Sequence, residues 1–172
     1  RNAMAPLDRG RSPGKPSRKR RRTVMKPAPA VTLRPLTESD IDAIAALDAL
    51  WHEDAWSRDY LWGYFRDPRC LAYVAIGNAP YVGFAGGHIE DSVLRIGNLA
   101  VAPTYRRQGV GLLLIRHIAV IAKEYGLRDL RLEVRDSNGP ALALYEKTGF
   151  VTVRRLKGYY GAADALEMHR PL

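Results

Sequence analysis

The sequence predicts a single α+β domain with a mixed, mostly antiparallel sheet flanked by helices. In several short segments, apolar residues alternate with polar ones, as they do in half-buried strands. In other segments, apolar residues recur at helical spacing, and Gly, Pro, Asn and Asp separate the two kinds of segment. The 172 residues, 47% hydrophobic and 26% charged, are sufficient for one domain with a substantial core.

The first predicted elements are a strand and two helices. Residues 31–36 alternate as a short strand would. Thr37, with Asp40 three residues later, approximates a capping signal for the first helix. The second helix is expected to begin at Ser57 and to end before Pro68, because proline disfavours helix in the residue that precedes it.

The rest of the chain predicts six strands and two helices. Three strands at short intervals, with turn residues between them, predict an antiparallel meander over residues 71–76, 81–89 and 93–101. The remaining elements are a helix from Gly109 to about Gly126, a half-buried strand over 130–134 and a helix that Asn138 opens and Gly149 closes. Val151 and Val153 begin a further strand, and residues 165–169 form the last. The predicted order is β-α-α-β-β-β-α-β-α-β-β.

The net charge of +9 resides in an N-terminal tail. Residues 1–26 hold ten Lys or Arg and one acidic residue, whereas residues 27–172 hold 17 of each sign. We expect residues 1–28 to be disordered and residues 29–172 to form the domain. The three residues before Met4 resemble a cloning remnant. The basic run is compatible both with a contact to the ribosome or RNA and with a solvated extension.

Composition argues against several classes of protein. No run approaches 18 apolar residues, and no apolar segment follows the basic N-terminus, so we expect a cytoplasmic protein without membrane contact. The single cysteine, Cys70, cannot form an internal disulfide and is predicted to be a small buried hydrophobe. The four histidines have no ligand spacing among themselves, so no metal site is expected.

A glycine-containing segment, residues 106–111, joins a predicted strand to a helix. Gly109 and Gly111 leave backbone N–H groups uncovered at the helix N-terminus, where a phosphate is favoured. A tight turn without a ligand would also explain the two glycines. A dinucleotide fold is not supported, since the third glycine of its fingerprint is absent and the preceding strands are predicted to be antiparallel.

Three motifs together resemble the GNAT acetyltransferases. Arg106-x-x-Gly109-x-Gly111, after the strand at residues 96–101, is similar to their acetyl-CoA motif. Residues 132–138 and 143–150 resemble the RimI-type ribosomal-protein-alanine acetyltransferases and archaeal N-terminal acetyltransferases. The resemblance covers residues 31–170 and implies the GNAT fold. It also implies transfer of acetyl from acetyl-CoA to the N-terminal α-amino group of a protein or peptide. The resemblance to the RimI-type enzymes makes a ribosomal protein one candidate acceptor.

The resemblance also implies where acetyl-CoA binds. The backbone of one strand would pair with the pantetheine arm, and the Val101 N–H would stabilise the charge that develops on the thioester oxygen. The implied cofactor-binding residues are Leu99, Ala100, Val101, Arg106, Arg107, Gln108, Gly109, Val110, Gly111, Asn138 and Tyr145. Asn138 is equally well explained as a helix cap.

Glu133 and Tyr145 are the implied catalytic residues. Alternation alone favours an exposed Glu133 paired with a neighbouring arginine, whereas the resemblance favours a general base. Tyr145 would return a proton to the CoA thiolate, although a core aromatic would fit the same position. An α-amine has a pKa of about 7.7–8.0 against about 10.4 for lysine, so its neutralisation at pH 7 costs roughly 3 to 4 kcal/mol less. A glutamate that acts through a water molecule is therefore a sufficient general base for an N-terminal amine.

Acceptor-binding residues are expected from two segments. Tyr159 and Tyr160 lie in a segment similar to the hairpin that covers the peptide groove in N-terminal acetyltransferases. Trp51, His52, Glu53 and Trp56 would lie on the opposite wall of this groove, although packing on the sheet is favoured for the two tryptophans.

Two alternative functions stay open at this point. One is acetylation of lysine, a polyamine or another small amine, for which Glu53 and Asp54 offer acidic groups. The other is a ribosome- or RNA-binding protein that keeps a GNAT scaffold and uses the basic tail. The sequence specifies neither the acceptor protein nor the oligomeric state.

Overall fold

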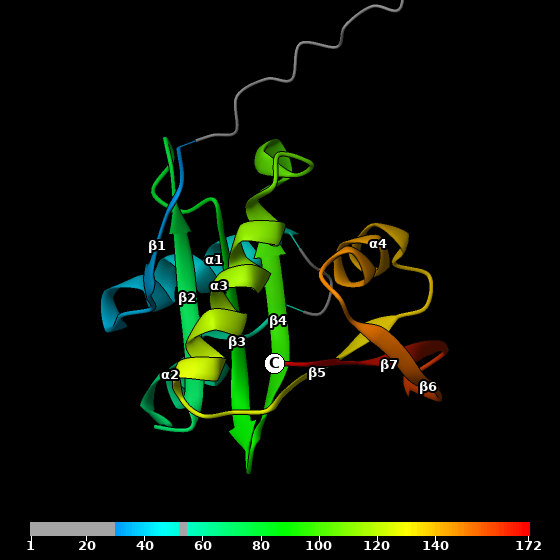
Figure 1. The fold of residues 1–172 in the computed structure, drawn as a ribbon. Coiled ribbons are helices and arrows are strands. Elements are labelled where there is room, and N and C mark those ends of the chain that lie inside the picture. Colours follow the sequence, from blue (N-terminus) through cyan, green and yellow to red (C-terminus); the bar gives the residue numbers. More distant parts are fainter. Residues whose placement is uncertain (1–29, 52–54) are drawn as a thin grey trace, which may run out of the picture.

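The computed structural model describes residues 30–51 and 55–172, which contain a seven-stranded sheet and four α-helices (Figure 1). The strands are β1 (Thr32–Pro35), β2 (Cys70–Ile76), β3 (Gly83–Glu90), β4 (Val93–Val101), β5 (Asp129–Arg135), β6 (Val151–Tyr160) and β7 (Ala163–Pro171). The helices are α1 (Ile41–Trp51), α2 (Arg58–Arg66), α3 (Val110–Glu124) and α4 (Gly139–Lys147), with short 3-10 turns η1 (Glu38–Asp40) and η2 (Pro103–Tyr105). The predicted order of strands and α-helices is confirmed, whereas the 3-10 turns were not predicted.

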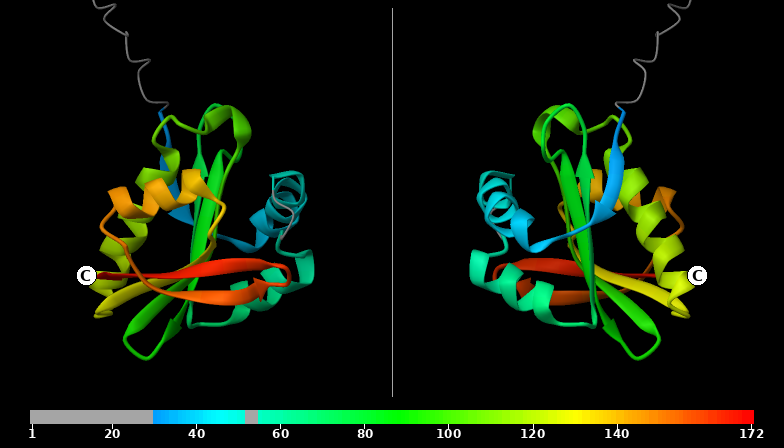
Figure 2. Two further views of the ribbon diagram at one scale, coloured as in Figure 1. Left: turned by 90° about the vertical axis from the view of Figure 1, so that its right-hand side faces the viewer. Right: turned by 90° about the vertical axis from the view of Figure 1, so that its left-hand side faces the viewer.

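The sheet separates two helical layers. Its strand order is β1-β2-β3-β4-β5-β7-β6, and every neighbouring pair is antiparallel except β4 with β5. Helices α1 and α2 cover one face and α3 and α4 the other (Figure 2). The predicted mixed, mostly antiparallel sheet with flanking helices is therefore confirmed.

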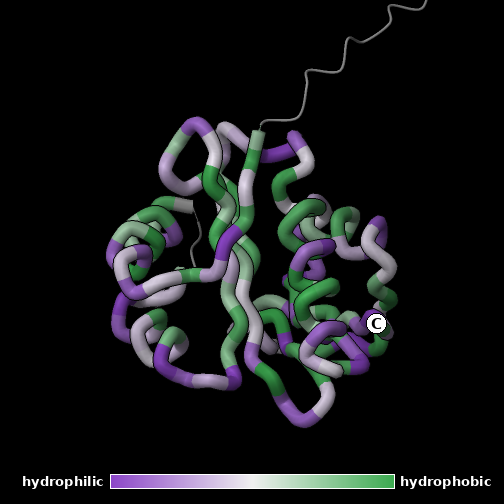
Figure 3. Tube along the Cα trace, turned by 60° about the vertical axis from the view of Figure 1, so that its left-hand side comes forward, coloured by the Kyte–Doolittle hydropathy of each residue, from purple (hydrophilic) through white to green (hydrophobic). Residues whose placement is uncertain are grey.

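Each face of the sheet has its own apolar core. In Figure 3 the hydrophobic segments follow the central strands and the inner sides of the helices, while hydrophilic segments gather in the turns. Helix α3 contributes one stripe at helical spacing, consisting of Val110, Leu114, Ile115, Ile118, Ala119 and Ala122. None of the described helices is long and apolar enough to cross a membrane. The predicted tail, residues 1–28, lies outside the described residues, and its order and contacts stay predictions.

The residues predicted to cap the first two helical segments make capping interactions in the structure. Thr37 and Asp40 form a reciprocal capping box, and Ser57 accepts a hydrogen bond from the Tyr60 N–H at 3.2 Å. Asp40 is buried and also binds both Nη atoms of Arg34, at 2.6 and 2.8 Å. This guanidinium holds the pKa of the Asp40 carboxyl well below its usual range. The capping box begins the 3-10 turn η1, which leads directly into α1, and it ties this segment to β1.

The sequence predicted where strand β6 begins, at Val151, but not that it continues to Tyr160. Nearly all of its residues are exposed, so no alternation of buried and exposed side chains marks it. It is the edge strand of the sheet and carries Arg154, Arg155 and Lys157, and charged residues of this kind discourage pairing with other chains. Pairing with β7, rather than burial, defines its extent.

The central feature of the sheet is the separation of β4 from β5. Among the described residues, these strands pair only from Val93–Asp129 to Ile96–Leu132. At that point β4 carries a bulge, since neighbouring residues of β3 pair with Ile96 and Asn98 and leave Gly97 without a register partner. Strands β5 and β7 then turn away from the rest of β4 (Figure 1).

A buried carboxylate fastens helix α1 to this bulge. Asp48 is completely buried and accepts hydrogen bonds from the Trp56 backbone N–H at 2.8 Å and from Asn98 Nδ2 at 3.1 Å. Nothing in the local sequence distinguished Asp48 from a solvated helix residue. Its role follows from a contact between residues that are 50 positions apart.

We expect Asp48→Ala to lower the free energy of unfolding by about 1–3 kcal/mol, because it leaves a backbone N–H and a side-chain amide without their acceptor. Urea denaturation measures the change. Asp42→Ala is the matched control, since Asp42 lies on the same helix with a 71% exposed side chain, and it should cost about 0.5 kcal/mol or less. Equal losses in the two variants would contradict the anchoring role of Asp48.

Candidate functional site

The free edge of β4 is the first component of the site. The Ala102 N–H donates to Val82 O at 2.9 Å, so it points toward β3. Successive backbone amides along a strand point to opposite edges, so the amides of Val101 and Leu99 point toward the side that β5 has left. An edge of this kind can bind an extended ligand through backbone hydrogen bonds.

The loop between β4 and α3 is braced by its own side chains. Arg106 Nε donates to Val101 O at 3.0 Å, and Gln108 Nε2 donates to Thr104 O at 2.6 Å. The sequence predicted both residues to bind the cofactor. In the structure their side chains hold the loop, and the Arg106 backbone N–H also donates within it, to Pro103 O at 3.3 Å. The backbone N–H of Gln108 is therefore what this pair chiefly offers a ligand.

The same loop ends in an open helix N-terminus. Arg107 and Gly109 have positive φ angles of 61° and 89°, and Gly109 is the N-cap of α3. A Cβ on Gly109 would meet no described atom within 4 Å, so its backbone conformation, rather than crowding, explains the glycine. The Leu113 N–H bonds to Gly109 O at 2.9 Å, and the N–H groups of the preceding turn have no intrahelical acceptor. Such a terminus favours a phosphate.

Gly111 is needed for a different reason. A Cβ at this position would lie 3.0 Å from Leu144 Cδ2 of α4, and 3.7 Å from side-chain atoms of Leu99 and Val101. The missing side chain therefore lets α4 approach the first turn of α3 and the free part of β4. From the sequence, Gly111 was expected to leave a backbone N–H uncovered for a phosphate, and the approach of α4 was not predicted.

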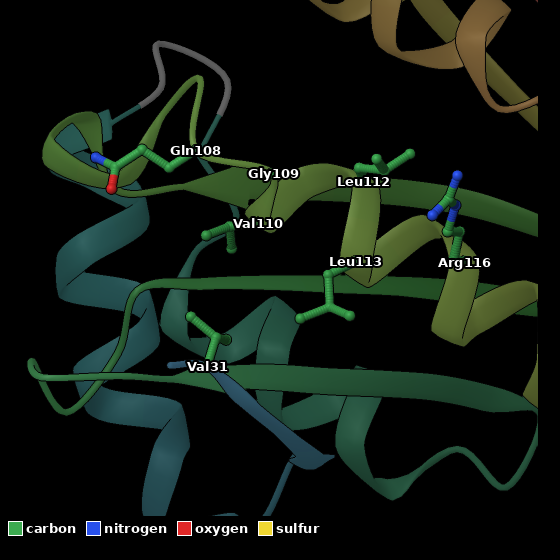
Figure 4. Close-up of a pocket in the computed structure, with 7 residues that line it drawn as sticks. All are labelled: Val31, Gln108, Gly109, Val110, Leu112, Leu113 and Arg116. Atoms are coloured by element: carbon green, nitrogen blue, oxygen red, sulfur yellow. The ribbon is translucent and has the colours of Figure 1, made fainter. Parts of the chain in front are cut away.

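A shallow hollow of about 230 Å³ opens beside the start of α3. Figure 4 shows Val110 and Leu113 directed toward Val31, with Gln108 and Arg116 at opposite ends. Its lining consists of Val31, Gln108, Gly109, Val110, Leu112, Leu113 and Arg116. Of these, only Gln108 and Gly109 belong to the loop described above, and Val110 is the first residue of α3.

Helix α4 contributes Asn138 and Tyr145. The Asn138 side chain accepts from the Ala141 N–H at 3.2 Å, so it caps the helix. Tyr145 is buried, with its ring centroid 5.6 Å from that of Phe150. Burial, with a smaller effect of Tyr160, raises the pKa of Tyr145 to about 12. Its hydroxyl makes no hydrogen bond to another described residue and stays protonated at neutral pH, so it is a proton donor.

Glu133 on β5 lies largely out of solvent, with 11% of its side chain exposed. Its carboxylate pairs with Arg95 of β4 rather than with an arginine of its own strand. Burial raises the pKa of Glu133, and the charges of Glu167 and Glu90 raise it further, while Arg95 opposes them. The exposed glutamate that alternation alone favoured is therefore not observed.

A second carboxylate faces Glu133 directly. Glu167 of β7 is its register partner and is only 4% exposed. Like charges opposite each other across strands are unfavourable, and arginines offset this cost. Arg154 pairs with Glu167, and Arg131 Nη1 lies 3.8 Å from it. The sequence did not single out Glu167, because only the register of β5 and β7 places it here.

The β6–β7 hairpin brings two tyrosines to this cluster. The Tyr160 hydroxyl donates to the Glu133 backbone carbonyl at 3.3 Å, and the Arg135 guanidinium lies 4.4 Å from the centre of its ring. Tyr159 is about half exposed. Its partial burial raises its pKa, and the charge of Glu133 raises it further. The two predicted acceptor residues of this hairpin therefore lie beside the predicted base.

The opposite wall of the predicted acceptor groove lies only partly within the described residues. His52, Glu53 and the side chain of Trp51, all predicted to contact the acceptor, lie outside the described residues, as does Asp54. Trp56 packs on the sheet, and a Cβ on Gly97 would lie 2.9 Å from its ring. Packing of this tryptophan on the sheet was predicted and is confirmed.

Comparison with known proteins connects this geometry to a family. Residues 39–150 match the model of the acetyltransferase (GNAT) family, which is more than half of the chain. The chain belongs to the GNAT family. The resemblance in the sequence is thereby confirmed, and this GNAT protein is an acetyl-CoA-dependent acetyltransferase.

The match to this chain covers nearly the whole length of several similar proteins. An N-alpha-acetyltransferase of Saccharolobus solfataricus is 34% identical, with 82% of this chain and 93% of that protein covered. The [ribosomal protein bS18]-alanine N-acetyltransferase of Escherichia coli K12 is 33% identical, with coverage of 82% and 97%. The crystal structure of the ribosomal-protein-S18-alanine N-acetyltransferase from Escherichia coli has a TM-score of 0.76 at 30% identity, with coverage of 82% and 93%.

Proposed function

We propose that this GNAT enzyme acetylates the N-terminal α-amino group of a protein. The observation that carries the proposal is its similarity, over 82% of the chain, to two enzymes whose names state α-amino or alanine N-acetylation. A ribosomal protein is the more specific candidate acceptor, since one of the two is named for it. The geometry supports the proposal at three places, which are the free edge of β4, the start of α3 and the Glu133 cluster.

The backbone is suited to hold acetyl-CoA. The uncovered N–H groups at residues 107–111 would bind the pyrophosphate, and the free amides of Leu99 and Val101 would pair with the pantetheine arm. When bound, the thioester supplies an activated acetyl group. The Val101 N–H, which points to the free edge, would donate to the carbonyl oxygen and favour the transition state over the ground state.

Glu133 is the proposed general base. Burial and the neighbouring Glu167 make it a stronger base than a solvated glutamate, which brings its pKa closer to that of an α-amine. It would accept the proton of the attacking amine directly or through a water. Tyr145, protonated and without a hydrogen-bond partner among the described residues, is the proposed donor to the departing thiolate.

The acceptor peptide is proposed to lie against the β6–β7 hairpin. Tyr159 and Tyr160 flank Glu133 there, and Trp51, His52 and Glu53 would complete the groove as predicted from the sequence. A contact of the basic tail with a ribosome or RNA, and a cytoplasmic location, stay predictions.

The reaction can be tested with acetyl-CoA and matched peptides. One peptide has a free N-terminus and no lysine, a second has a blocked N-terminus and one internal lysine, and a polyamine serves as a third acceptor. We expect CoA release, and a mass increase of one acetyl group, with the first peptide only. Activity on lysine or the polyamine, with none on any free N-terminus, would reject the acceptor class and leave the family assignment intact.

We expect Glu133→Gln and Tyr145→Phe each to lower kcat by about 10²-fold or more, because each removes one proton-transfer group. The affinity for acetyl-CoA, measured by calorimetry, should stay nearly unchanged. Glu146→Gln and Tyr125→Phe are matched controls at exposed positions and should keep wild-type kcat. Retention of turnover per folded molecule in the first pair would show that other groups transfer the protons.

Replacement of Glu167 by glutamine should change the pH dependence of the reaction. Glu133 must be ionised to act as a base, so activity rises with pH through its pKa. Glu167→Gln removes a charge that raises this pKa, while Arg95, Glu90 and Tyr159 still face the carboxylate. The acid limb of kcat/KM should therefore move to lower pH.

The measurement compares the two enzymes with one peptide, so that titration of the amine is common to both profiles. Glu124→Gln, at an exposed position on α3, is the control and should leave the profile unchanged. An unshifted acid limb in Glu167→Gln would mean that Glu167 does not set the basicity of Glu133.

A further inference from the structure

Three side chains with metal-binding atoms converge away from the acetyltransferase site. They are Asp67 at the end of α2, Cys70 at the start of β2 and His88 on β3. Their ligand atoms all lie within 4.8 Å of one another. Within residues 30–51 and 55–172, this is the one such group of three or more His, Cys, Asp or Glu side chains.

The register of β2 and β3 brings the cysteine and the histidine together. Cys70 and His88 are direct cross-strand partners. The Ile89 N–H donates to Arg69 O at 2.7 Å, so that pair is the hydrogen-bonded one and Cys70–His88 is the adjacent non-hydrogen-bonded pair. Side chains of a non-hydrogen-bonded pair lie closer together and on one face of the sheet. The backbone therefore fixes two of the three ligands.

The third ligand is oriented by the turn before β2. Asp67 Oδ2 lies 3.3 Å from His88 Nε2, while Oδ1 accepts from the Arg69 backbone N–H at 2.9 Å and from Arg69 Nε at 3.1 Å. The Cys70 N–H also donates to Asp67 O at 3.0 Å. The hydrogen bonds to Oδ1 orient the carboxylate so that Oδ2 faces the histidine, where it also accepts from Arg69 Nη2. Carboxylates that bind metals are commonly oriented by hydrogen bonds in this way.

We propose that Cys70 Sγ, His88 Nε2 and Asp67 Oδ2 form a binding site for a divalent cation of the Zn²⁺ type. One sulfur, one imidazole nitrogen and one carboxylate oxygen match the ligand preference of Zn²⁺. The side chains of Asp67 and His88 are 25% and 32% exposed, so an ion can enter and a water can complete a tetrahedron.

Binding requires two local changes. The Cys70 thiol releases its proton to solvent when the thiolate–metal bond forms. Arg69 Nη2, now 2.8 Å from Asp67 Oδ2, must leave this oxygen, while the hydrogen bonds to Oδ1 can remain. The bound ion would fasten the end of α2 to β2 and β3. No sequence motif indicated the site, because spacing among histidines does not reveal a cysteine–histidine pair formed across two strands.

The test uses the full chain, without a polyhistidine tag and freed of metal by a chelator. Zn²⁺ affinity is measured by competition with a chromophoric chelator, and Co²⁺ is added in a parallel titration to detect the thiolate-to-cobalt absorption band. We expect one equivalent of Zn²⁺ to bind and the thiolate band to appear.

Cys70→Ser and His88→Gln should each weaken Zn²⁺ binding roughly 10-fold or more, and Cys70→Ser should abolish the cobalt band. His169→Gln is the matched control, because His169 also contacts an aspartate, Asp129 at 2.6 Å, and should leave both signals unchanged. Circular dichroism of the metal-free variants checks that each is folded. Absence of stoichiometric binding, or binding that survives both substitutions without a thiolate band, would overturn the proposal.

Discussion

The separation of β4 from β5 is the constraint on which the site depends. Backbone N–H and C=O groups in a sheet are normally paired, so a strand that leaves its neighbour exposes a row of them. Here the bulge at Gly97 marks the point where this happens, and Asp48 fixes the bulge through Asn98. The exposed edge then lies beside the open N-terminus of α3, which places hydrogen-bond donors for an extended ligand next to donors for its phosphates.

The electrostatics of the Glu133 cluster follow from the pairing of β5 with β7. This pairing places Glu133 and Glu167 opposite each other, where solvent screens them little. The cost of two buried carboxylates is offset by arginines from three strands, of which Arg95 contacts Glu133 and Arg154 contacts Glu167. The balance raises the pKa of Glu133 without neutralising the cluster, and this makes the proposed proton transfer from an α-amine less unfavourable.

Fold and family could be predicted from the sequence because their signals are local. The capping residues of η1, α2 and α4, the alternation in β5 and the glycine at the start of α3 each need only a few neighbouring residues. Other features depend on contacts between distant segments. Edge strand β6 carries no burial pattern, Gly111 is small because Leu144 approaches it, and the side chain of Arg106 is folded back onto Val101 rather than free for a ligand.

The order of the elements, the loop that leaves a helix N-terminus uncovered and the resemblance to GNAT acetyltransferases could all be recognised in the amino-acid sequence. Which side chains meet depends instead on how the elements pack. Tertiary structure placed Glu167 opposite Glu133, paired Glu133 with Arg95, and set Cys70 against His88. The physical reason is that local propensity and periodicity act over a few residues, whereas cross-strand register depends on how the whole sheet packs between its two helical layers.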